Sequence, residues 1–178
     1  MKDKDIKIKV EIENILQNES SGLALKSYFE NIPENRIRRS LHILSSIYPG
    51  KTKVSDDDFS FISYMITNEK FLKQDNFFEF IFSLTIIDFT EIQKKILSCL
   101  IKEHFEKLCE ACTFELDSLL VKIFDRSDLF RYVETLSDSS NISVLRRISD
   151  ILRYEDFSDT NVSNEALEAL KNKISCLL

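Results

Sequence analysis

The longest amphipathic stretch of this sequence, residues 90–112, is the feature that most constrains its fold. Apolar side chains recur there at helical spacing, and charged side chains occupy the opposite side. The apolar set is Ile92, Ile96, Leu97, Leu100, Ile101, Phe105, Leu108, Cys109 and Cys112. At 3.6 residues per turn, this pattern predicts a helix of about six turns with one buried face. Thr90 and Gln93 have the spacing of a capping box, which predicts where the helix begins.

The rest of the chain shows the same periodicity in shorter segments separated by polar residues. Helices are expected over residues 5–17, 21–32, 33–48, 56–66, 76–84, 114–124, 128–136, 142–154 and 165–177, with a short helical piece around 71–72. Ser55 and Asp58 form a second capping box, and Ser127 and Asn164 are expected to cap the helices that follow them. Residues 76–84 are apolar almost all round, so we expect that helix to be buried on several sides.

Residues 5–17 fit two patterns. Apolar residues alternate from position 6 to position 12 as in a strand, whereas Ile8, Ile12 and Ile15 also fit one face of a helix. A lone strand would have no partner among helical neighbours, so a helix is favoured. Only two Gly and two Pro occur in 178 residues, which favours helices joined by short turns in a single all-α domain over residues 1–178.

Two junctions between expected helices resemble each other. Residues 87–91 and 124–128 each place an apolar residue and an Asp before a hydroxyl residue and an acid. Asp88 and Asp125 are 37 residues apart, and helix-pair repeats of the HEAT, armadillo and tetratricopeptide kind have periods of about 34 to 47 residues. The Trp, Gly and Pro signatures of those repeats are missing. We therefore expect antiparallel helix pairs stacked as a short, degenerate HEAT/armadillo-like α-solenoid.

No residue pattern indicates catalysis or a bound cofactor. His42 and His104 lie within expected helices and lack the partners of a catalytic or metal-binding pair. Cys109 and Cys112 form a CxxC near a helix end, without the second pair that a zinc site requires. The sequence therefore predicts no catalytic, cofactor-binding or metal-binding residues, and a protein that is not an enzyme.

Charge and hydropathy exclude two further classes of partner. The net charge is −6, and the small Arg clusters at 36–39 and 146–153 have no accompanying aromatic set, so nucleic-acid binding is not expected. The most apolar run, residues 77–89, contains two acids and is too short to span about 30 Å of hydrocarbon. The charged N-terminal residues lack the apolar core of a signal peptide. We therefore expect a cytoplasmic protein without a membrane partner.

Acidic residues in loops and at helix starts are the best functional lead. Antiparallel pairing would bring several of these loops to one edge of the stack, where they could attract a basic protein. Carboxylates at helix starts also interact favourably with the helix dipole, which is a purely structural explanation. The candidate partner-binding residues are Asp56, Asp57, Asp58, Asp88, Glu91, Asp125, Asp128, Glu155 and Asp156.

A short acidic chain of degenerate helix pairs, with repeated junctions at 87–91 and 124–128, resembles the helical-repeat immunity proteins of bacterial contact-dependent growth-inhibition and polymorphic toxin systems. This resemblance implies an inhibitor, monomeric before binding, that neutralises a cognate toxin domain, often a basic nuclease. The alternative is a helical-repeat scaffold or adaptor that binds a peptide or helix in a groove. An exposed apolar patch and binding insensitive to salt would indicate the alternative.

Overall fold

The computed structural model describes residues 3–50 and 53–178, and these ranges contain helices and no strands. The helices are α1 (Asp3–Leu16), α2 (Ser21–Asn31), α3 (Glu34–Ile47), the 3-10 turn η1 (Tyr48–Gly50), α4 (Asp56–Thr67), α5 (Glu69–Leu72), α6 (Phe77–Leu84), α7 (Glu91–Ala111), α8 (Phe114–Ile123), α9 (Arg126–Leu136), α10 (Ile142–Tyr154) and α11 (Asn164–Leu177). The segment with two sequence interpretations is therefore the helix α1. The all-α expectation is confirmed for the described residues.

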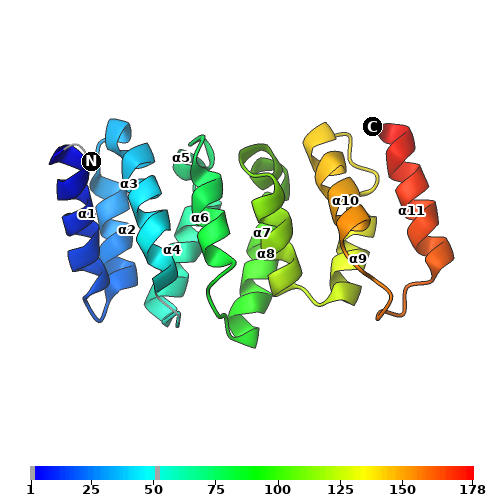
Figure 1. The fold of residues 1–178 in the computed structure, drawn as a ribbon, viewed down its shortest axis with the longest axis horizontal. Coiled ribbons are helices and arrows are strands. Elements are labelled where there is room, and N and C mark those ends of the chain that lie inside the picture. Colours follow the sequence, from blue (N-terminus) through cyan, green and yellow to red (C-terminus); the bar gives the residue numbers. More distant parts are fainter. Residues whose placement is uncertain (1–2, 51–52) are drawn as a thin grey trace.

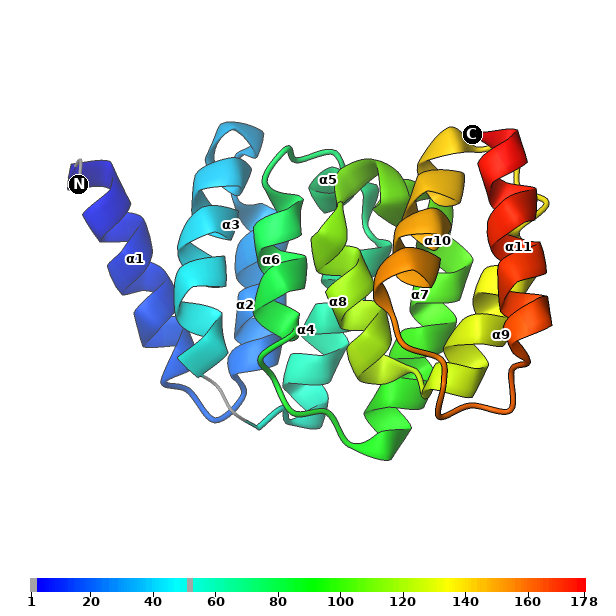
Figure 2. The ribbon, with the colours of Figure 1, turned by 45° about the vertical axis from the view of Figure 1, so that its right-hand side comes forward.

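The helices follow one another along the long axis in chain order, with the two termini at opposite ends (Figure 1). Successive helices run in opposite directions (Figure 1), and the most extensive packing joins helices that are not consecutive in the chain. In one row, which we call the outer row, α1 contacts α3, α3 contacts α6, α6 contacts α8, and α8 contacts α10. Behind it α2 contacts α4, and α4 contacts α7 (Figure 2). The last helix, α11, packs on α10.

Hydrogen bonds repeat at a nearly constant sequence separation of 36 to 39 residues. They join Ser21 to Asp58, His42 to Glu79, Arg38 to Asn76, Val54 to Gln93, Glu69 to Lys107, Thr85 to Lys122 and Ser137 to Lys173. Each bond links one helix, or the residues next to it, to a helix or junction in the next layer of the stack. The spacing agrees with the 37 residues between Asp88 and Asp125.

Local capping sets where the helices begin. Both predicted capping boxes are present: the side chain of Thr90 accepts from the N–H of Gln93, and that of Ser55 accepts from the N–H of Asp58. Two other predicted caps are wrong. The α9 cap is Asp125, whose extended backbone lets its carboxylate accept from the N–H of Asp128 at 2.8 Å. Likewise Ser163, rather than Asn164, caps α11.

The buried faces of α6 and α7 differ from the prediction. Ile92 and Ile96 are 73% and 45% exposed, because the first turns of α7 project past the neighbouring helices (Figure 2). In α6, Phe78 and Phe82 are 37% and 47% exposed. That helix lies between α3 and α8 in the outer row, so one side of it has no covering helix. The helix is thus buried by α3 and α8, in keeping with the expected burial on several sides, while the side that carries Phe78 and Phe82 stays open.

Gly22, which is buried at the start of α2, lies very close to the backbone of α4. A Cβ atom at this position would lie 2.1 Å from the backbone oxygen of Asp57, in the first turn of α4. Because the obstacle is backbone, a side-chain rotation cannot relieve the contact. Only glycine lets these two helices pack at this distance.

Gly22→Ala is expected to lower the free energy of unfolding by about 2 kcal/mol or more, the upper range for overpacked cores. Gly50→Ala is the matched control, since no atom lies within 4 Å of its added Cβ. We expect that control to change stability by less than about 1 kcal/mol. Urea denaturation of the three proteins measures the difference, and equal stability of both variants would contradict the close approach.

Candidate functional site

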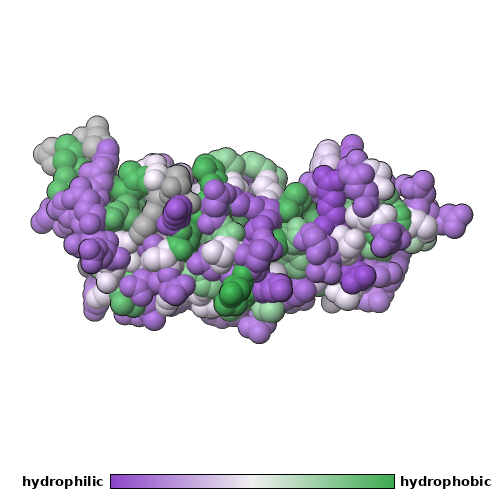
Figure 3. Space-filling view, turned by 90° about the horizontal axis from the view of Figure 1, so that it is seen from below, coloured by the Kyte–Doolittle hydropathy of each residue, from purple (hydrophilic) through white to green (hydrophobic). Residues whose placement is uncertain are grey.

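The acidic junctions lie along one edge of the molecule. The connections from α3 to α4, α6 to α7, α8 to α9 and α10 to α11 all reach the lower edge in Figure 1. An isolated β-bridge between Lys53 and Asp88 joins two of these junctions directly. Figure 3 views this edge and shows hydrophilic side chains along most of its length, interrupted by a few hydrophobic ones. We call this surface the junction edge.

Most of the predicted acidic residues are accessible on the junction edge, and one is not. Asp56, Asp88, Glu91, Asp125, Asp128 and Asp156 are exposed, while Asp57 and Glu155 are half-buried. Asp58 is fully buried, and its carboxylate accepts hydrogen bonds from Ser21 and Ser55. Asp58 therefore joins α2 to α4 and is not available to a partner.

Lysines offset the acids at the middle of the junction edge. Lys94, Lys95, Lys102 and Lys122 line a hollow that also contains Glu91 and Asp125. Lys94 pairs with Glu91 at 2.8 Å, and this hydrogen bond lowers the pKa of the Glu91 carboxyl. Burial lowers the pKa of the Lys122 ammonium, an effect that nearby Asp88 opposes. Lysines thus offset the acidic side chains less at the two ends of the junction edge, at Asp56–Asp57 and at Glu155–Asp156.

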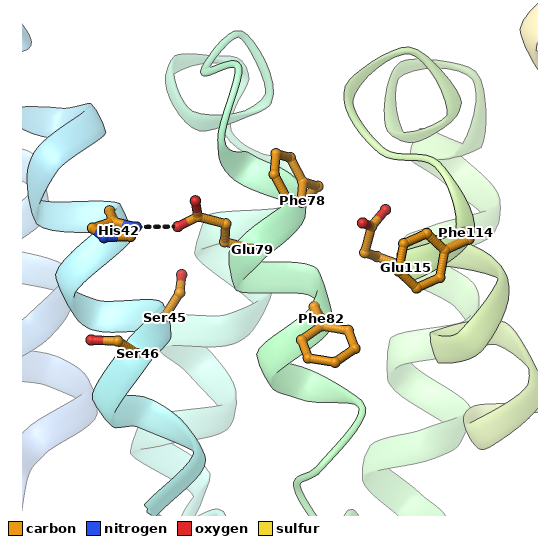
Figure 4. A pocket seen from close by; sticks show the side chains of 8 residues that line it. All are labelled: His42, Ser45, Ser46, Phe78, Glu79, Phe82, Phe114 and Glu115. Carbon is orange, nitrogen blue, oxygen red and sulfur yellow. Dashed lines mark hydrogen bonds and ion pairs between the residues drawn. The ribbon is translucent and has the colours of Figure 1, made fainter.

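An apolar pocket of about 370 Å³ opens on the outer row, between α3, α6 and α8. Its lining residues are His42, Ser45, Ser46, Phe78, Glu79, Phe82, Phe114 and Glu115. The rings of Phe82 and Phe114 meet edge-to-face with centroids 6.5 Å apart. Figure 4 shows His42 directed from α3 toward Glu79 on α6, and Nδ1 of His42 lies 2.7 Å from Oε2 of Glu79. We call this the α3–α6–α8 pocket.

Sequence reasoning missed this pocket. Phe78 and Phe82 belong to the helix that was expected to be buried on several sides, and Phe114 is 59% exposed at the start of α8. The one available signal was the all-round apolar character of residues 76–84, since such a helix needs more neighbours than a two-row stack supplies. Glu115 gave no signal in the sequence, because its burial depends on the packing of α8 beside α6.

A buried charge cluster joins α8 to α10. The Arg147 guanidinium lies 2.9 Å from Asp117 and 2.6 Å from Asp150. Burial raises the pKa of the Asp117 carboxyl to about 7, although the charge of Arg147 opposes this shift. The opposite charges compensate each other across the helix interface, so the cluster is explained by packing.

The two cysteines of the CxxC, Cys109 and Cys112, lack the environment of a reactive thiol. Cys109 and Cys112 are buried, and burial raises the pKa of the Cys109 thiol to about 12 and that of Cys112 further. Reactive thiols instead need a lowered pKa. Across residues 3–50 and 53–178, no group of three or more His, Cys, Asp or Glu could hold a metal ion. None of the described helices is long and apolar enough to cross a membrane.

The raised pKa of Asp117 predicts a pH-dependent stability. Between about pH 4 and pH 7 the folded state holds a proton that the unfolded state has released, so the free energy of unfolding should fall as pH rises. The change is at most about 1.4 kcal/mol per pKa unit. Asp117→Asn cannot titrate and should lose this slope. Urea denaturation of both proteins from pH 4.5 to pH 8 measures the difference, with parallel curves as the contradicting result.

Comparison with family models, with curated proteins and with solved structures finds no match for this chain. Its binding properties are therefore inferred from its own surfaces.

Proposed function

We propose that this chain is a non-catalytic protein-binding module that binds and neutralises a basic protein domain, as immunity proteins do with their cognate toxins. The observation that carries this proposal is the gathering of acidic junctions on one edge (Figure 1). Side chains from four junctions, far apart in sequence, present carboxylates to the same side. A surface of one sign attracts an oppositely charged protein and speeds its association.

We further propose that the helix pairs form a short, degenerate α-solenoid of the HEAT/armadillo kind. The hydrogen bonds between residues 36 to 39 positions apart support this, since a stacked repeat places equivalent positions next to each other. A solenoid suits an inhibitor, because each layer adds to one continuous surface.

The alternative role, a scaffold that binds a peptide or helix in a groove, has an observation of its own. The α3–α6–α8 pocket exposes three phenylalanines on neighbouring helices. Exposed aromatic side chains around a hollow are typical of protein-binding surfaces. Because this pocket lies on the outer row rather than on the junction edge, both surfaces can contact one partner.

Charge reversal on the junction edge tests the proposed function. Asp56→Lys combined with Asp156→Lys is expected to slow association with the partner by several-fold to about tenfold at low salt. The loss should shrink above about 0.5 M salt, where the Debye length is only a few ångströms. The partner is first isolated from the native cell with the tagged wild-type chain, and rates are measured by stopped-flow fluorescence.

The matched control is Glu30→Lys with Glu134→Lys. These exposed residues lie near the C-terminal ends of α2 and α9, at the edge opposite the junctions, and the net charge changes equally. If both double variants slow association alike, net charge alone is responsible and the junction edge is not the binding surface. An association rate independent of salt would also contradict the proposal.

A further inference from the structure

Glu115 is a largely buried residue that presents one carboxylate oxygen to the α3–α6–α8 pocket. The residue is only 5% exposed. Its Oε2 accepts from the backbone N–H and the hydroxyl of Thr113 at 3.2 and 2.9 Å. Its Oε1 accepts no hydrogen bond from the described residues. Figure 4 shows this carboxylate directed into the space between Phe78 and Phe114. Oε1 therefore remains able to accept a hydrogen bond from a ligand that enters the pocket.

The charges around the pocket favour a cation. Glu79 is the second carboxylate in the lining, and its side chain is 28% exposed. The lining contains no Lys or Arg, so the only basic side chain is His42, which already contacts Glu79. Two acids in a hollow with low-dielectric walls attract a positive group more strongly than the same acids in open water would.

The apolar wall adds a second requirement for the occupant. Phe78 and Phe82 lie one helical turn apart on α6, and Phe114 continues the aromatic surface onto α8. Such rings favour a flat cation or an aliphatic stem above them. An arginine side chain has both parts, together with a fork of N–H donors that matches a carboxylate. The aromatic surface covers two helices, which is more than one side chain occupies.

We propose that the α3–α6–α8 pocket is the docking site for an arginine carried by a helix of the partner protein. The guanidinium hydrogen-bonds to Oε1 of Glu115 and to Glu79, and the stem lies against Phe78, Phe82 and Phe114. Neighbouring apolar residues of that helix cover the remaining aromatic surface. This proposal rests on the proposed function, because it supplies a buried anchor for a basic partner that the junction edge attracts.

The test uses a synthetic helical peptide of alanine and leucine with one arginine, acetylated and amidated at its ends. A second peptide replaces arginine by citrulline, which has nearly the same shape and no charge. NMR spectra of the chain with labelled phenylalanine rings report binding. We expect the arginine peptide to shift the Phe78, Phe82 and Phe114 signals, and the citrulline peptide to bind at least about tenfold more weakly.

Glu115→Gln separates charge from structure. The glutamine oxygen can still accept from Thr113, so the fold is kept while the negative charge is removed. This variant should bind the arginine peptide about tenfold more weakly than the wild-type chain and bind the citrulline peptide equally well. Glu103→Gln, an exposed residue on the polar side of α7, is the control and should change neither. Phe114→Ala should weaken the binding of both peptides. Because the Phe114 side chain is 59% exposed, this substitution should leave the chain folded.

Several outcomes would overturn the arginine pocket. They are equal binding of the two peptides, equal binding of free arginine amide and the arginine peptide, and no ring shifts at millimolar peptide. Backbone amide spectra of the uniformly labelled chain in which the peptide perturbs only Asp56, Asp57, Glu155 or Asp156 would overturn it as well, while leaving a basic partner on the junction edge in place. The proposed function fails separately, through salt-independent association of the native partner.

Discussion

Burial of the apolar helix faces against neighbouring helices, most extensively between α2 and α4, α3 and α6, and α6 and α8, is the interaction on which the rest of this structure depends. The described residues contain no sheet, and all four cysteines are free thiols. Packing between layers must therefore supply the stability, at roughly 25 cal/mol for each Å² of apolar surface buried. In the N-terminal half, much of this packing is between aromatic rings. The ring of Phe61 lies 5.9 Å from that of Phe29 and 6.2 Å from that of Phe80, measured between centroids.

This packing also decides where charge can gather. Because helices of the two rows run in opposite directions, α4, α7, α9 and α11 all begin on one edge (Figure 1). Acidic residues near those helix starts are stabilised by the positive ends of the helix dipoles. The same arrangement that stabilises each helix thus gathers acidic residues on the junction edge. Lysines on α7 and α8 limit the effect at the centre of the edge.

A two-row stack leaves one side of every helix without a neighbour. In α6 that side carries Phe78 and Phe82, although polar residues would be the usual choice for a solvated surface. Beside them, Glu115 is 5% exposed, and its Oε2 is held by the backbone N–H and the hydroxyl of Thr113. The uncovered side of α6 therefore combines aromatic rings with a carboxylate.

The sequence by itself determined the helical class, both capping boxes and the extent of α7, because these depend on interactions within one turn or one helix. It also contained the spacing of about 37 residues. Only the tertiary structure decided which side of each helix is covered. Asp58 lost its predicted role because α2 buries it, whereas Phe82 and Ile92 remain exposed because no helix covers them completely. Periodicity identifies the apolar face of a single helix, but the neighbours that cover that face come from residues far away in the chain.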